Sequence, residues 1–260
     1  MTPRREEFTV AEGAAVVLRL ASGSTRFVEG APGRVTVEIE GRDPEGFTVQ
    51  QEGDRILIEQ PSGVLRWGRY DVMVTAPAGI RLEAHMATTD LDATLLLGSL
   101  TANVASGELH VGDVSGDVRV KSASGDLRIG DVGGELDVTT ASGDVRVGAV
   151  AGAVEVSTAS GGCQLAGAAD VLDVRSASGD VVIKRFDGSD LRAKSMSGDV
   201  RIGFPPGRTL DVDLSTISGT VRNTFGLDAS SGGGSNGGPR VRVNARTVSG
   251  DIVLDRASAG

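Results

Sequence analysis

The chain has 260 residues, a formal charge of −9 and a pI of about 4.8, with 38 glycines and only 3% aromatic residues. This acidic chain lacks the clustered Lys and Arg that bind phosphates, which excludes a nucleic-acid-binding protein. The shortage of aromatic rings disfavours a globular α/β enzyme and fits a thin core with frequent turns. A single cysteine, Cys163, excludes internal disulfides and a cysteine-based zinc site.

The N-terminal segment, residues 1–77, is predicted to form a cap of short β-strands. Segments 35–40 and 56–59 have high β propensity and are separated by Gly and Pro. A solenoid needs such a cap because its end strands otherwise expose unpaired backbone.

Neither a secretory leader nor a membrane span is found in the sequence. Residues 1–10 have no apolar run behind their arginines, and no window reaches the roughly 18 apolar residues of a transmembrane helix. We therefore expect a cytoplasmic protein without a transmembrane segment. Cell-surface localisation would require another export route.

The second segment, residues 78–256, is predicted to be a repeat domain. Residues 80–187 form twelve consecutive nine-residue units without a gap. The third and fifth positions of every unit are apolar, and the fourth is polar in all units except at Val182. This alternation is typical of a half-buried strand. Gly occupies the first position of nine units, where a tight corner requires it.

Alternate units differ, because an Ala-Ser pair precedes only every second unit. The true repeat is therefore 18 residues, with two strands per coil, and like positions stack at roughly 4.8 Å in parallel. The predicted fold class is all-β, a single-chain, β-helix-like β-solenoid of nine-residue strand–turn units with an N-terminal β cap. Its handedness and cross-section stay open.

The repeat continues with insertions after residue 187. Leu191, Val200, Leu210 and Val221 are expected to extend the inward-facing column. The Ser/Gly-rich run at 228–239 has too little apolar content to pack, and it is predicted to be a flexible loop.

Repeated sequence lines give a family resemblance. TTASGDVRV, RSASGDVVI, SMSGDVRI, TISGTVRN and TVSGDIVL, with the entry YDVMVTAP at 70–77, resemble a bacterial family of β-strand-repeat proteins known as "putative adhesins", the domain of unknown function 4097. The resemblance covers residues 60–256 approximately. It implies a structural or binding role, often associated with the cell envelope and in some members with envelope stress. It brings no catalytic residues.

A column of aspartates that follow glycine raises the question of calcium. Calcium-binding β-rolls also use a nine-residue Gly/Asp repeat, but they supply more ligands per turn than this chain does. We favour aspartates that cap their own turns by accepting hydrogen bonds from backbone amides, and keep a calcium-binding β-roll as an alternative. The residues are Asp117, Asp126, Asp144, Asp180, Asp199 and Asp251.

Outward-facing fourth positions give two candidate partner-binding faces. An opposing interpretation is local neutralisation, because Asp126 and Asp144 stand two residues before arginines on the same face. The basic candidates are Arg128, Arg146 and Arg201, and the acidic candidates are Asp137, Glu155 and Asp173.

No catalytic, cofactor-binding or metal-binding residue is predicted. The Ser and Thr residues recur too regularly for nucleophiles, His85 and His110 lack further ligands in metal spacing, and Cys163 falls in the inward column. The predicted function is a non-enzymatic structural or binding module of the adhesin type. It would present flat strand faces to an unknown protein or cell-envelope component, as a monomer or weak homo-oligomer. A cytosolic regulatory or scaffolding protein of an envelope-stress circuit is the alternative.

Overall fold

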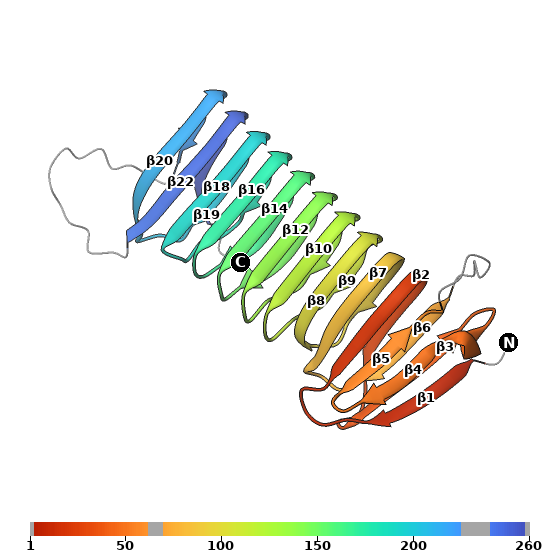
Figure 1. The fold of residues 1–260 in the computed structure, drawn as a ribbon. Coiled ribbons are helices and arrows are strands. Elements are labelled where there is room, and N and C mark those ends of the chain that lie inside the picture. Colours follow the sequence, from red (N-terminus) through yellow and green to blue (C-terminus); the bar gives the residue numbers. More distant parts are fainter. Residues whose placement is uncertain (1–2, 62–69, 225–239, 258–260) are drawn as a thin grey trace, which may run out of the picture. The chain divides into compact units, whose positions relative to one another are not determined.

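The computed structural model describes residues 3–61, 70–224 and 240–257, and nearly all of its regular structure is β-strand (Figure 1). The predicted fold class, an all-β solenoid with parallel coils, is confirmed. The chain divides into two compact units, Met1–Gly134 (unit 1) and Glu135–Gly260 (unit 2). The loop predicted at 228–239 lies outside the described residues.

Unit 1 combines parallel coils with short antiparallel strands. Its coils stack with an 18-residue offset, as in the pairing of Val118 with Leu100 and of Leu127 with Leu109. This offset confirms the predicted two-strand coil. The elements are β1 (Arg4–Thr9), β2 (Ala15–Glu29), β3 (Arg34–Glu40), a 3-10 turn (Pro44–Gly46), β4 (Thr48–Glu52), β5 (Arg55–Glu59), β6 (Asp71–Ala76), β7 (Ile80–Ala93), β8 (Leu97–Ser106), β9 (Leu109–Val111), β10 (Val118–Ser124) and β11 (Leu127–Ile129).

Strand β2 connects the two kinds of pairing in unit 1. It runs parallel to β7 over almost its whole length, while its first half also pairs with β5 and its second half with β6. Antiparallel pairing occurs between β1 and β3, β3 and β6, and β4 and β5. Parallel pairing therefore starts inside the segment predicted as a cap, and the boundary at residue 77 stays a prediction.

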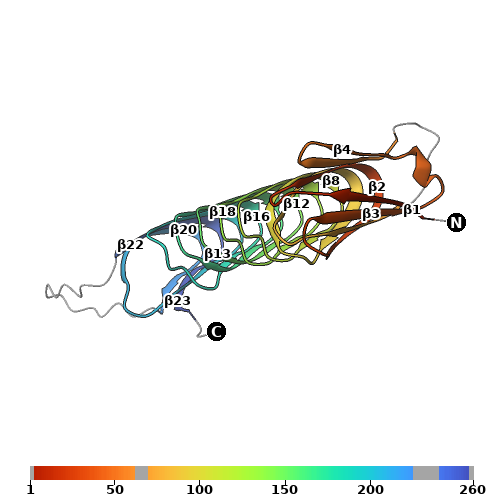
Figure 2. The ribbon, with the colours of Figure 1, turned by 90° about the horizontal axis from the view of Figure 1, so that it is seen from below.

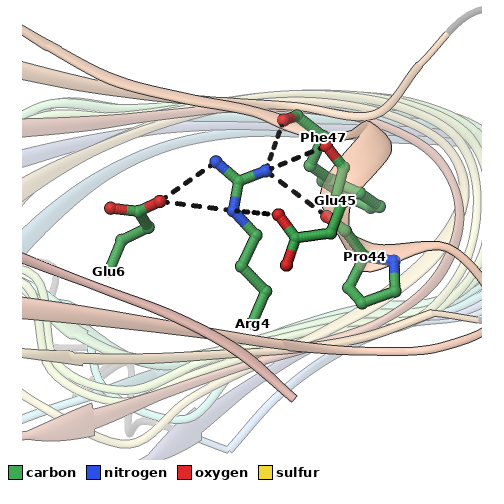
Figure 3. A network of polar contacts seen from close by, with 5 residues as sticks. All are labelled: Arg4, Glu6, Pro44, Glu45 and Phe47. Atoms are coloured by element: carbon green, nitrogen blue, oxygen red, sulfur yellow. Dashed lines mark hydrogen bonds and ion pairs between the residues drawn. The ribbon is translucent and has the colours of Figure 1, made fainter. Parts of the chain in front are cut away.

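A single arginine fastens the 3-10 turn of unit 1 to the outer strand β1. Arg4 Nη1 donates to the carbonyl of Phe47 at 2.7 Å and lies within 3.4 Å of the carbonyls of Pro44 and Glu45, and Nη2 pairs with Glu6 at 3.1 Å (Figure 3). The Arg4 side chain is only 15% exposed, so these contacts satisfy a largely buried charge. They hold the turn against the edge of the sheet.

Unit 2 is built from strands in two layers whose inward rows share one core (Figure 2). The first layer is β12, β14, β16, β18, β22 and β20, and the second is β13, β15, β17, β19, β23 and β21. The bounds are β12 (Leu136–Ser142), β13 (Val145–Val150), β14 (Val154–Ser160), β15 (Cys163–Ala168), β16 (Leu172–Ser178), β17 (Val181–Ile183), β18 (Asp190–Ser197), β19 (Val200–Phe204), β20 (Thr209–Ser218), β21 (Val221–Asn223), β22 (Arg240–Ser249) and β23 (Ile252–Arg256).

The last coil in the sequence is not the last coil in space. Strand β22 pairs with β18 on one side and β20 on the other (Figure 1). In the second layer, β23 lies likewise between β19 and β21. The chain thus builds its end coil from β20 and β21 before it returns to fill the position beneath them.

This order explains why the predicted inward column is less buried at its end. Leu191 and Val200 are fully buried, as expected. Leu210 is only partly buried and Val221 is 42% exposed, because the end coil has a neighbouring coil on one side only among the described residues.

Candidate binding surfaces

The repeated hydroxyl groups serve the corners of the coils. In unit 2, Thr140 and Thr158 are buried and donate to the backbone carbonyls of Ser142 and Ser160 at 3.1 and 3.3 Å. Such a bond lets a polar group lie at the edge of the core without an unsatisfied donor. These two hydroxyl groups therefore stabilise corners of the coils.

The aspartate column links one coil to the next. Asp144 Oδ1 accepts from the amide of Gly162, Asp180 Oδ1 from that of Asp199, and Asp199 Oδ1 from that of Asp251, each at 2.9 Å. The predicted role as acceptor for backbone amides is right, but the donor belongs to the next coil in space and not to the same turn. Among the described residues, no group of three His, Cys, Asp or Glu side chains could hold a metal ion.

Cys163 lies in the inward row of unit 2 between Val145 and Val181. The side chain is 2% exposed, and burial raises the pKa of the thiol to about 12. Because the thiolate is the reactive form, this cysteine is a packing residue at neutral pH.

The basic candidate residues are each paired with a nearby carboxylate. In unit 1, Arg128 on β11 lies 3.5 Å from Asp126. In unit 2, Arg146 on β13 pairs with Asp144 at 2.7 Å and Arg201 on β19 with Asp199 at 3.3 Å. Within unit 2, the rungs of Gln164 and Val182 separate Arg146 from Arg201. The structure does not bring these two into one continuous basic stripe.

The acidic candidate residues do lie together in unit 2. Asp137, Glu155 and Asp173 occupy successive rungs of β12, β14 and β16. Arg175 bridges two of them, at 2.9 Å from Glu155 and 2.6 Å from Asp173. The hydrogen bond to Glu155, followed by the charge of Asp173, raises the pKa of the Arg175 guanidinium. We call Asp137, Glu155 and Asp173 the acidic stripe.

A hollow with a cavity volume of about 480 Å³ lies on the surface of unit 1. It lies over the outward face of a five-strand array in the order β3, β6, β2, β7 and β9. One row of facing residues is Glu38, Met73, Arg26, Asp92 and His110, and the next is Glu40, Asp71, Ser24, Asp90 and, beside Asp90, Glu108.

Six carboxylates and two basic side chains line this hollow. Arg26 lies 3.5 Å from Asp92, and the Ser24 hydroxyl donates to Asp71. Asp90 accepts from the amide of Glu108 at 3.0 Å. Because the carboxylates outnumber the basic side chains, the electrostatic potential in the hollow is negative.

A family model matches residues 15–255, which is most of the chain including both units. Its description is Toastrack DUF4097. The chain belongs to this Toastrack family. The match agrees with the resemblance carried by the repeated Ser-Gly-Asp lines, and it extends upstream to β2, whose parallel pairing with β7 begins at Ala15.

Solved structures similar to this Toastrack chain have low sequence identity. One, from Bacteroides fragilis, is described as a putative adhesin; it shares 11% identity with a TM-score of 0.47, and the match covers 97% of each chain. A second putative adhesin, from Parabacteroides distasonis, shares 12% identity with a TM-score of 0.43 and the same coverage. A third structure, also from Parabacteroides distasonis, is described as a putative lipid binding protein; it shares 13% identity with a TM-score of 0.39 over 96% of each chain. Among curated proteins, no relative of the chain was found.

No helix in the described part of the Toastrack chain has the length and apolar character needed to cross a membrane.

The hollow was missed by reasoning from the sequence. Alternation along β3 does place Glu38 and Glu40 opposite the buried Val37 and Ile39, so their outward orientation could be predicted. Nothing in the sequence indicates that β6 pairs with both β3 and β2, which brings these two glutamates beside Asp71 and the coil. The missing information was the pairing of strands outside the nine-residue repeat.

Proposed function

We propose that this Toastrack chain is a non-enzymatic binding module of the adhesin type, and that the hollow in unit 1 receives a basic segment of a protein or cell-envelope partner. The observation that carries the proposal is the concave five-strand face with its volume of about 480 Å³. Concave surfaces with converging polar groups are the usual places where proteins bind ligands. The excess of carboxylates favours a cationic ligand, because complementary charge raises both association rate and specificity.

The chemistry of the repeated residues supports a role without catalysis. A catalytic centre needs titratable groups in perturbed environments, placed near one another. In the described residues, the recurring hydroxyls of Thr140 and Thr158 donate to corner carbonyls, and the recurring aspartates accept from amides. The thiol of Cys163 is buried and has its pKa raised to about 12. These groups maintain the stack, and the hollow adds carboxylates for recognition.

The acidic stripe of unit 2 is the second candidate surface. Its three carboxylates lie on successive rungs, which gives them the regular spacing of a flat ladder. Arg175 neutralises part of this charge. The stripe is also flat, so it excludes less water from a bound ligand than the hollow does.

The test compares two variants with the same change in charge. In the hollow variant, Glu40→Gln, Asp71→Asn and Asp92→Asn remove three charges with little change in shape. In the control variant, Asp137→Asn, Glu155→Gln and Asp173→Asn do the same to the acidic stripe. The probe is a fluorescent oligolysine peptide, titrated at physiological ionic strength, where long-range attraction is screened.

We expect the hollow variant to bind the peptide at least about tenfold more weakly, and the control variant to bind within about twofold of the unaltered protein. Equal weakening of both variants would contradict the proposal, because it would indicate diffuse attraction to an acidic protein. Weakening of the control alone would assign binding to the acidic stripe.

A further inference from the structure

The end coil of unit 2 leaves the edges of both layers open. Strand β20 has ten residues and pairs in the described structure only with β22, and β21 pairs only with β23. Half of the backbone N–H and C=O groups of an edge strand point away from its neighbour. An edge of this length is therefore a template for another strand.

The inward row of β20 is apolar and incompletely covered. Leu210, Val212 and Leu214 are each partly exposed. Their neighbours in the next coil, Val241, Val243 and Ala245, are at most 1% exposed. Ile217, at the end of β20, is 81% exposed. Among the described residues nothing covers the open side of this row, and a second layer of side chains over it would complete the core.

Apart from two aspartates, strand β20 lacks the features by which proteins normally protect an edge. It contains no Pro and no Lys, and none of its inward positions is charged. Its two carboxylates, Asp211 and Asp213, are exposed on the outward face. Asp213 is already held by Arg246 and Asn244, each at 2.9 Å.

We propose that two copies of the chain associate end to end through this coil, with β20 pairing antiparallel to the β20 of the second copy about a two-fold axis. The same axis, passing through both layers of unit 2, brings β21 against its own copy. A second copy therefore covers both edges at once, since it offers two edges with the same separation. A single foreign strand covers only one.

Charge selects the register of this pairing. Placing Leu214 opposite the partner's Leu214 puts Asp213 opposite the partner's Ser215. If the two-fold axis passed through residue 213 instead, the two copies of Asp213 would lie opposite each other, and like charges in this position destabilise a sheet. The chosen register also keeps the inward faces of both copies on the same side, with the two Leu214 side chains at the centre and each Val212 opposite the partner's Thr216. This inference rests on unit 2 alone and does not depend on what the hollow binds.

Sedimentation equilibrium of the full chain tests the proposal. We expect a mass that rises with concentration to twice the 26.5 kDa of one chain. Leu214→Lys should raise the dissociation constant at least about a hundredfold, because a lysine would face its own copy across the axis. The matched control is Val49→Lys, which places the same charge at a partly buried position of β4, an edge strand of unit 1. It should leave the dissociation constant unchanged.

Amide hydrogen exchange of the unaltered protein gives a second measurement that does not depend on any variant folding. Exchange in residues 209–218 should slow as protein concentration rises, while exchange in β1 and β4 should not. A chain that stays monomeric through the micromolar range overturns the proposal, and so does a dimer that Leu214→Lys leaves intact. Protection of residues 209–218 that is independent of concentration overturns it as well, because another part of the same chain then covers the edge.

Discussion

The outer strands of unit 1 and the end coil of unit 2 both form sheet edges, but these edges differ in length and in the charge of their side chains. In unit 1 the edge strands β1 and β4 are five or six residues long and rich in charged or polar side chains, and Arg4 fastens the adjoining turn. In unit 2 the edge strand β20 is ten residues long and has an unprotected apolar row. Short strands and a high density of charge, as in β1, oppose further pairing more strongly than the long and mostly uncharged β20 does.

The difference shows how little of a coil's stability is contained in its own sequence. Strands β20 and β22 have similar alternating patterns, and both end in a Thr-x-Ser-Gly corner. The inward row of β22 is buried because a coil covers each side, whereas that of β20 is covered on one side. A repeat unit in a solenoid is therefore stabilised mainly by its neighbours.

The largest predicted effect compares two adjacent valines in these coils. Val243→Asp places a charge without a partner in a fully buried row and should destabilise unit 2 by on the order of 4 kcal/mol or more. Val212→Asp, one rung further out, should cost only about 1 kcal/mol at protein concentrations low enough to keep the chain monomeric, because its carboxylate then reaches solvent. Chemical denaturation followed by circular dichroism measures both values. Equal losses would show that β20 is buried in solution by something outside the described residues.

A somewhat smaller effect is expected from two glycines in different kinds of turn. Gly161 stands at a coil corner in unit 2 with φ at +123°, and an added Cβ would overlap the carbonyl oxygen of Gly143 in the coil below. Gly161→Ala should therefore cost about 3 kcal/mol, since the backbone conformation and the stacking both oppose a side chain.

The matched change is Gly53→Ala in the β4–β5 hairpin of unit 1, where φ is +62° and a Cβ would meet no atom within 4 Å. Only the left-handed conformation opposes this alanine, so the cost should be about 1 kcal/mol. Thermal melting of the two variants gives the comparison. If Gly53→Ala proved the more damaging, corner stacking would not be what requires glycine in the coils.

Removing the arginine that fastens the edge of unit 1 should have a smaller effect. Arg4→Met keeps the aliphatic length but loses the bonds to the carbonyls around Phe47, which should cost about 1–2 kcal/mol. Arg5→Met is the control, because Arg5 is 64% exposed and pairs only loosely with Glu38 at 3.4 Å, and should change stability by at most about 0.5 kcal/mol. Faster amide exchange in β1 and β4 of the Arg4 variant alone would confirm that the arginine stabilises this edge.

The coils are predicted well from the sequence because each one repeats the same local pattern of apolar and polar residues. Alternation at the third and fifth positions correctly places Val145 and Val147 inward and Arg146 outward, and the 18-residue offset matches the observed register. The order of the last coils could not be predicted, because β20 and β22 have equivalent patterns and either could pair with β18. Only the packing of whole coils distinguishes these two arrangements.

Candidate surfaces were predicted unevenly for a similar reason. The acidic stripe follows from the repeat, so its three residues do lie on successive rungs. The hollow depends on pairing between β3, β6 and β2, and β4 and β5 lie between β3 and β6 in the sequence. Residues such as Glu40 and Asp71 become neighbours only through that pairing. Local periodicity carries no information about such contacts, so the hollow could not be predicted from the repeat.

The smallest predicted effect concerns calcium, and it tests whether packing alone stabilises the coils. The carboxylates of Asp144, Asp180 and Asp199 are engaged by amides of the next coil, so adding millimolar calcium or a chelator should leave the melting temperature unchanged. A calcium-dependent β-roll would instead lose its structure on chelation, because metal binding and folding are then one equilibrium.

Asp199→Asn provides the control, since the amide oxygen can still accept from the amide of Asp251. This variant should melt within a few degrees of the unaltered protein with or without calcium. A rise of many degrees in the melting temperature on adding calcium, lost in Asp199→Asn, would mean that calcium binding at Asp199, and not stacking alone, stabilises the coils.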